Sequence, residues 1–162
     1  SRNQSSFTRE ILQGKKDEYK IMGYEHKEFF TRIDSVQNYY LANQMLLDTE
    51  KRKALFRENM PVYTKIGDNG PVKYGLESSI KNSLIADGCI VEGTVENSIL
   101  FRGVKVGKGS VIRNCVLLQG TKVGTNCSIS SVITDKNVEI SSEKVLTGSD
   151  TYPLYIGKDG KI

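Results

Sequence analysis

The side chains that could carry chemistry are few in this chain of 162 residues. His26 is the only histidine, and it stands between Glu25 and Lys27. A catalytic zinc site takes three protein ligands, so a site built from histidines is excluded. The sequence holds no phosphate-binding loop, no Gly-x-Ser-x-Gly motif and no paired-carboxylate motif. We therefore expect His26 to be a surface residue without a catalytic role.

A recurring phrase between residues 80 and 140 organises the chain around these few groups. Each copy sets a polar residue before two aliphatic residues, and the copies are 15, 17 and 16 residues apart, counted over Asn82, Asn97, Asn114 and Ser130. A finer six-residue step runs inside them. Aliphatic residues keep this step, and small or branched residues lie four positions after the first three of them: Leu100, Val106, Ile112 and Leu118, then Val104, Ser110 and Val116.

Six residues are too many for one helical face and too regular for a plain hairpin strand. They fit one side of a triangular coil, made of a short strand and a tight corner, with both residue sets pointing inward. Glycines and asparagines tolerate positive φ and are expected at the corners. These residues are Gly88, Gly93, Gly103, Gly107, Gly109, Gly120, Gly124, Asn82, Asn97, Asn114, Asn126 and Asn137.

The two periods together predict a mainly β protein, a parallel β-helix of hexapeptide repeats. In the known hexapeptide folds the coil is left-handed, an exception to the usual right-handed crossover, so we expect a left-handed coil. The alternative is an all-β sandwich with strands every roughly eight to twelve residues. A sandwich gives no reason for one phrase to return at nearly constant spacing.

Short elements flank the predicted β-helix. Before it, two short strands are expected at 19–24 and 29–33, followed by an amphipathic helix that Asp34 or Ser35 caps and that runs to about Asp48. The predicted domains are an α/β remnant at 1–58, a linker at 59–77, the β-helix at 78–148 and a tail at 149–162.

Composition narrows the function classes. The net charge is +4, and the one basic cluster, Lys51 to Lys53, reads as a solvated helix end rather than a nucleic-acid site. No apolar run approaches the ~20 residues of a membrane span, and no signal peptide opens the sequence. Cys89, Cys115 and Cys127 are an odd number without Cys-x-x-Cys spacing, and they occupy small-residue positions of the repeat. We expect free thiols in a reducing, cytoplasmic compartment.

Several segments in series resemble the C-terminal part of the glucose-1-phosphate adenylyltransferase, or ADP-glucose pyrophosphorylase, family. The resemblance covers about residues 20 to 148. Residues 23–25, 35–43 and 46–48 resemble the end of its nucleotidyltransferase domain, and 61–64 its interdomain linker. Residues 82–89 and 100–107 resemble its β-helix. The family makes ADP-glucose and diphosphate from ATP and glucose 1-phosphate for glycogen synthesis, with Mg²⁺. Most of the nucleotide-binding domain has no counterpart here, so the resemblance implies a fragment without activity or cofactor of its own.

One departure from the family concerns its metal-binding motif. Catalytic members carry a motif like Trp-x-Asp-Val-Gly-Thr before the helix, whose aspartate helps to hold magnesium. The matching run, residues 30–35, has Arg32 at that place, and a cation there repels the metal. The resemblance thus implies a non-catalytic, GlgD-type regulatory subunit. An alignment shifted by two residues would instead put Asp34 in the metal-binding role.

The resemblance also implies a regulatory role through partners. Many members bind anionic sugar phosphates with basic residues of the β-helix, and Arg102 and Lys105 lie in the matching phrase. The alternative is that both are solvated outward residues. A later phrase that is arginine-rich in some regulated relatives reads Ser-Ile-Ser-Ser at 128–131, which weakens an effector site. We therefore expect the chain to act through contacts with a catalytic subunit or with itself.

Two other function classes remain open. A hexapeptide acyltransferase would carry a histidine base within its coils, and this sequence has none there. A purely structural assembly domain would not need the helix and linker that precede the repeat.

Overall fold

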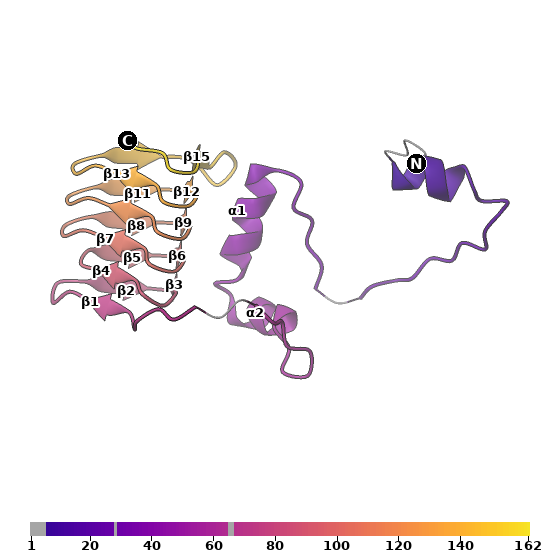
Figure 1. Ribbon diagram of the computed structural model, residues 1–162, viewed down its shortest axis with the longest axis horizontal. Coiled ribbons are helices and arrows are strands. Elements are labelled where there is room, and N and C mark those ends of the chain that lie inside the picture. The colour runs from indigo at the N-terminus through magenta and orange to yellow at the C-terminus, as the bar shows by residue number, and fades with distance from the viewer. Residues whose placement is uncertain (1–5, 28, 65–66) are drawn as a thin grey trace. The chain divides into compact units, whose positions relative to one another are not determined.

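The computed structural model describes residues 6–27, 29–64 and 67–162. Contacts divide the chain into two units, Ser1–Phe30 and Thr31–Ile162. In the first unit, a π-helix, η1 (Phe7–Gln13), begins after Ser6, whose hydroxyl accepts a hydrogen bond from the Arg9 amide at 3.4 Å. The second unit holds a parallel β-helix and two α-helices (Figure 1).

Each coil of the β-helix gives one strand to each of three parallel sheets, which we name A, B and C. The parallel β-helix predicted from the double period is therefore confirmed. Sheet A contains β1 (Lys73–Tyr74), β4 (Ile90–Val91), β7 (Lys105–Val106), β10 (Lys122–Val123) and β13 (Glu139–Ile140). Sheet B contains β2 (Ser79–Lys81), β5 (Thr94–Glu96), β8 (Val111–Arg113), β11 (Ser128–Ser130) and β14 (Val145–Thr147). Sheet C contains β3 (Leu84–Ile85), β6 (Ile99–Leu100), β9 (Val116–Leu117), β12 (Val132–Thr134) and β15 (Leu154–Ile156).

Aliphatic side chains stacked in register fill the axis of the β-helix. Burial of this apolar surface stabilises the coil, in addition to the backbone hydrogen bonds that join successive coils. The stacks are Val91, Val106, Val123 and Ile140 from sheet A, Val95, Ile112 and Ile129 from sheet B, and Leu100 and Leu117 from sheet C.

The predicted inward phase is wrong on one side of the coil. Val116 and Leu118 were expected to point inward, but Leu117 occupies the axis, and both of its neighbours pack with Tyr40 outside the coil. The step from Ile112 to Leu117 is five residues rather than six. Because side chains alternate along a strand, losing one residue exchanges the two faces.

Most corners follow the prediction. All five asparagines, with Gly88, Gly103, Gly109 and Gly120, have positive φ. Gly93, Gly107 and Gly124 do not have positive φ. At these positions the neighbouring coil leaves no room for a side chain: a Cβ on Gly93 would lie 2.3 Å from the carbonyl oxygen of Ser110. Ser131, at φ 52°, takes the corner position of Asn114 in the next coil. The fourth copy of the phrase therefore aligns on Ser131, not on Ser130.

Helix α1 (Val36–Met45) begins where the sequence predicts. The Ser35 hydroxyl accepts a hydrogen bond from the Asn38 amide at 3.0 Å, so the serine cap is confirmed. The helix ends three residues before the predicted limit, because the Asp48 carboxylate caps a second helix, α2 (Thr49–Leu55).

Two further predictions need correction. The strands expected at 19–24 and 29–33 are absent from the described residues of those segments. Most of their large apolar side chains are exposed, and a lone pair of short strands is marginal without a sheet to join. The β-helix is also longer than 78–148. Strand β1 pairs with β4 and β15 pairs with β12, so the coil takes in parts of the predicted linker and tail.

Candidate functional site

The outward face of sheet C is apolar, and α1 lies along it (Figure 1). One column of side chains runs across this sheet in register: Leu84, Ile99, Val116, Ile133 and Tyr155. Tyr40, on the inner face of α1, packs against Val116 and Ile133 and is only 1% exposed. The aromatic ring thus completes a second, smaller core outside the coil.

The Tyr40 hydroxyl carries polar contacts between α1 and the β-helix. It donates to the carbonyl oxygen of Asn114 at 2.8 Å and lies 3.2 Å from Oδ1 of Asp150. The hydroxyl of Ser131 donates to the same carboxylate oxygen at 3.4 Å. Burial, with a smaller contribution from the Asp150 charge, raises the pKa of Tyr40 to about 12. The hydroxyl therefore stays protonated, and able to donate, to a higher pH than that of an unburied tyrosine.

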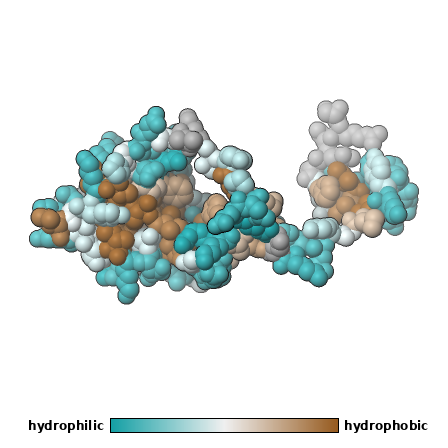
Figure 2. All heavy atoms as spheres, turned by 90° about the horizontal axis from the view of Figure 1, so that it is seen from below, coloured by the Kyte–Doolittle hydropathy of each residue, from teal (hydrophilic) through white to brown (hydrophobic). Residues whose placement is uncertain are grey.

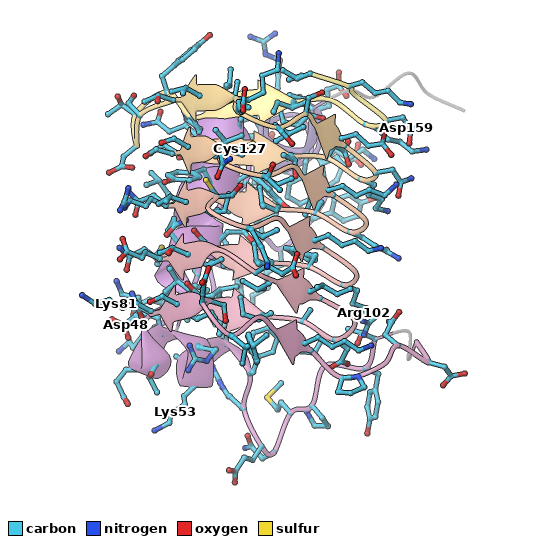
Figure 3. All side chains as sticks on the ribbon, turned by 90° about the vertical axis from the view of Figure 1, so that its left-hand side faces the viewer. Asp48, Lys53, Lys81, Arg102, Cys127 and Asp159 are labelled. Carbon is cyan, nitrogen blue, oxygen red and sulfur yellow. The ribbon has the colours of Figure 1, made fainter. Side chains whose placement is uncertain are left out.

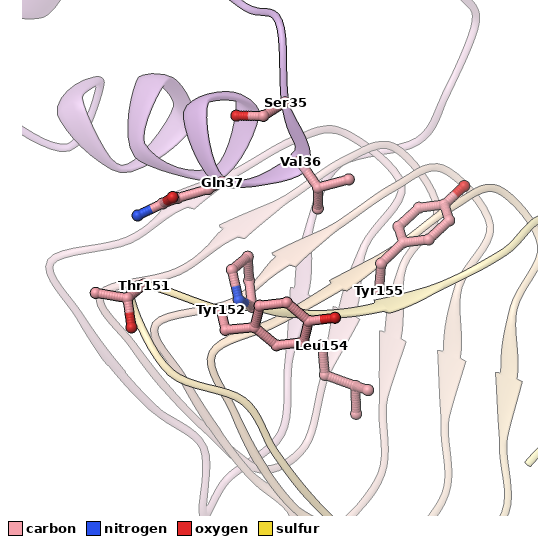
Figure 4. A pocket seen from close by; sticks show the side chains of 8 residues that line it. Ser35, Val36, Gln37, Thr151, Tyr152, Leu154 and Tyr155 are labelled. Carbon is pink, nitrogen blue, oxygen red and sulfur yellow. The ribbon is translucent and has the colours of Figure 1, made fainter.

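Two neighbouring pockets open at the first turn of α1. One, of about 450 Å³, lies between Ser35 to Gln37 and residues 151–155 (Figure 4). The other has Tyr39 and Ile133 among its lining residues, and at its rim the Tyr155 hydroxyl donates to the Asp135 carboxylate at 3.1 Å. Both linings are mainly apolar. They hold no histidine and no cysteine.

Arg32 lies on the exposed segment just before α1. Its Nε lies 2.9 Å from Oδ2 of Asp34, and the other oxygen of that carboxylate accepts a hydrogen bond from the Asn38 side chain at 2.6 Å. The positive charge thus sits beside the nearest carboxylate that could have held a metal. Within the described ranges, no group of three His, Cys, Asp or Glu residues is arranged for a metal ion.

Arg102 and Lys105 occupy two different parts of the β-helix surface. Arg102 lies on the edge where sheet C turns into sheet A, the same edge that carries Asp159 (Figure 3). The linker passes close to this edge, since the amide of Gly88 donates to the carbonyl of Gly70 at 2.7 Å. Lys105 projects from the outward face of sheet A, in register with Lys122. Lys122 is itself paired with Glu139 at 2.7 Å.

The remaining chemistry-bearing residues are three buried cysteines and one exposed histidine. Cys89, Cys115 and Cys127 are free thiols buried in the core of the coil, as small apolar groups would be. Burial raises the pKa of Cys89, and it raises that of Cys115 to about 12. His26 is exposed, with Nε2 3.2 Å from the carbonyl oxygen of Phe29.

Sequence reasoning missed the contact between Tyr40 and Asp150. The periodicity marked Tyr40 only as one apolar position of a helix. A signal was present in the spacing: one residue, Ser131, joins β11 to β12, whereas six residues, Gly148–Pro153, join β14 to β15 in the next coil. Because the equivalent corner of the preceding coil needs one residue, the six-residue connection indicates a segment that does more than turn the chain.

Comparison with known proteins decides the family. Residues 72–152, half of the chain, match the family described as GlmU-like, C-terminal hexapeptide. The chain belongs to this family. It is also 43% identical over 149 residues to the glycogen biosynthesis protein GlgD of Bacillus subtilis, covering 92% of this chain and 43% of that protein.

Two further relatives agree. The GlgD protein of Geobacillus stearothermophilus is 55% identical over 67 residues, 41% of this chain and 20% of that protein. The glucose-1-phosphate adenylyltransferase of Fusobacterium nucleatum is 38% identical over 96 residues, 59% of this chain and 25% of that protein. The family resemblance found in the sequence is confirmed: the chain is GlgD-like and of the ADP-glucose pyrophosphorylase family. It spans less than half the length of these relatives.

No helix in the described part of the chain is both long enough and apolar enough to cross a membrane.

Proposed function

We propose that this chain is the β-helix module of a non-catalytic, GlgD-type subunit that assembles with a catalytic glucose-1-phosphate adenylyltransferase in the cytoplasm. Its role is to modulate ADP-glucose formation for glycogen synthesis through contacts between subunits. Similarity to GlgD supports the pathway, and the exposed first coil of the β-helix supports the role in assembly.

The main support for the assembly role is the exposed apolar surface of the first coil. Seen from below, hydrophobic residues gather on the β-helix between hydrophilic ones (Figure 2). Among the first-coil residues, Leu76 is fully exposed and Ile80, whose register partner Val95 is buried, is 37% exposed. Strands β1, β2 and β3 each end a sheet, so one edge of each is unpaired within the described residues. Such an edge invites pairing with another chain.

At the opposite end, the chain covers part of its own edge. The amide of Ser141 donates to the carbonyl of Ile162 at 2.7 Å, and that of Glu139 donates to Gly160 at 2.8 Å. Sheet A is therefore extended at β13 by the last residues. Strands β14 and β15 still end sheets B and C, so the two ends differ in sheet A, and this difference favours the first coil as the contact surface.

The absence of catalysis rests on the segment before α1. Arg32 is ion-paired with Asp34, whose second oxygen is occupied by Asn38. Mg²⁺ is bound mainly by carboxylate and other oxygen ligands, and a fixed positive charge nearby repels it. These residues do not fit the metal of the family reaction, and we assign this chain neither a catalytic step nor a cofactor.

Arg102 and Lys105 are the candidate anion contacts, and we propose that they do not form an effector site. They lie on an edge and on a face of the β-helix, respectively. Calorimetric titration of the 162-residue chain with a sugar bisphosphate should give no saturable binding. Saturable binding that Lys105→Ala abolishes would replace this part of the proposal with an effector role.

The assembly role is tested by mixing the chain with a catalytic adenylyltransferase subunit of the same source. Sedimentation velocity should reveal a complex, and the rate of diphosphate release by the catalytic subunit should change when the chain is added. Ile80→Asp, which places a charge on the exposed first coil, should abolish both effects. Val145→Asp, on an exposed position of the opposite end, is the matched control and should leave both intact. The proposal would be overturned if the catalytic subunit did not bind the chain and its rate of diphosphate release stayed the same when the chain was added.

A further inference from the structure

The connection Gly148–Pro153 stands out from the other corners of the β-helix. In the preceding coil the equivalent corner is the single residue Ser131. The inserted residues bring Asp150 to the Tyr40 hydroxyl, while Thr151 and Tyr152 line the pocket at the first turn of α1 (Figure 4). The insertion therefore reaches the helix rather than only turning the chain.

Hydrogen bonding between α1 and the β-helix is concentrated at Tyr40. Every residue of α1 is described, and Tyr40 makes the side-chain hydrogen bonds that cross from this helix to the coil. At the other end of the helix, Nε2 of Gln44 is buried without a partner. At the first turn, a pocket separates Ser35 to Gln37 from residues 151–155. The side-chain hydrogen bonds from the helix to the coil thus lie at its middle and not at its two ends.

We propose that Tyr40 and the connection Gly148–Pro153 form a clasp that fixes the position of α1 on sheet C. Closed, the clasp holds the Tyr40 hydroxyl between the Asn114 carbonyl and the Asp150 carboxylate. Open, it leaves α1 held by apolar packing alone, and the helix can shift along the apolar column. The segment with Arg32 and Asp34 leads directly into α1 and moves with it.

The clasp gives the β-helix a route to the segment before α1. Asp150 belongs to the last coil and is hydrogen-bonded to Tyr40 of α1. Arg32, which is paired with Asp34, lies just before that helix. A contact that displaces Gly148–Pro153 would release the helix, so binding on the β-helix is coupled to residues far from it in sequence. This consequence rests on the proposed function, whereas the clasp itself does not.

Hydrogen exchange of the 162-residue chain tests the clasp without any partner. Tyr40→Phe and Asp150→Ala should each speed the exchange of the α1 amides about tenfold, because the helix then opens more often. Asp150→Asn keeps an acceptor oxygen, so the α1 amides of this variant should exchange at nearly the wild-type rate. Tyr152→Phe, an exposed residue of the same connection, is the matched control and should change nothing. Amides of β9 and β12 should be unaffected by all four substitutions.

Two outcomes overturn the clasp. If α1 exchange is unchanged in both Tyr40→Phe and Asp150→Ala, apolar packing alone holds the helix. If β9 and β12 exchange faster together with α1, Tyr40 is a support of the whole fold rather than a fastening of the helix. Neither result depends on a catalytic subunit, so failure here is distinct from failure of the assembly role.

Discussion

The hydroxyl of Tyr40 donates to the carbonyl oxygen of Asn114 at 2.8 Å, although 74 residues separate the two in sequence. Asn114 makes a corner of the coil with φ 51°, and that corner turns its carbonyl toward α1. A residue chosen for backbone geometry thus also supplies the acceptor for a buried helix side chain.

Ionisation of Tyr40 should be delayed in the folded chain. Its pKa is about 12, against about 10 for an unburied tyrosine, because burial disfavours the phenolate. The folded pKa is the higher one, so the stabilising effect is complete below pH 10 and is lost as pH rises through 12. In an absorbance titration at 295 nm, Tyr40→Phe should remove amplitude near pH 12 from the native protein. In denaturant the same substitution should remove amplitude near pH 10. Loss near pH 10 in the native protein would contradict the burial.

The three thiols should be inert in the folded protein. Cys89, Cys115 and Cys127 are at most 1% exposed, and only a thiolate reacts readily with a disulfide reagent. At pH 8, a thiol assay should detect no fast-reacting group until denaturant unfolds the chain, and then three. Lys105→Cys, at an exposed position of sheet A, should add one group that reacts at once. Rapid labelling of the unsubstituted chain would refute the buried assignment.

The five-residue step before Leu117 predicts which aliphatic residues support the coil. Leu117→Ala leaves a cavity on the axis and should lower the free energy of unfolding by about 2–5 kcal/mol in urea. Val116→Ala should lower the free energy of unfolding by roughly 1–2 kcal/mol, mainly because it weakens the packing of α1 on the coil. If Leu118→Ala costs as much as Leu117→Ala, the exchange of faces is wrong.

The double period was sufficient to predict the parallel coil because its two causes are local. Inward aliphatic residues recur every six positions, and asparagine or glycine is needed wherever φ is positive. The period could not reveal which side of a coil is one residue short, since Val116, Leu117 and Leu118 are all aliphatic. Only the pairing of Leu117 with Leu100 resolves that choice.

The candidate site was less predictable for a related reason. The clasp joins residues 110 positions apart, and no local pattern marks Tyr40 as different from Tyr39. The strands expected at 19–24 and 29–33 had the right composition but no sheet to pair with, so propensity alone misled. The assignment of roles to Arg32, Arg102 and Lys105 stays a prediction, although the structure adds the ion pair between Arg32 and Asp34.

The coil needs glycine for two different reasons, a positive φ and a close approach of neighbouring backbone, and substitutions can distinguish the two. Gly103 has φ +70°, with nothing within 4 Å of an added Cβ, and Asn137 occupies an equivalent corner. Gly103→Asn should therefore change the free energy of unfolding by no more than about 1 kcal/mol, because asparagine tolerates this conformation. At Gly93 an added Cβ would lie 2.3 Å from the Ser110 oxygen and 2.9 Å from that of Gly107. Backbone cannot yield as a side chain can, so Gly93→Ala should cost about 3 kcal/mol. Urea unfolding of both variants decides the matter, and equal costs would mean that the close approach at Gly93 does not exist.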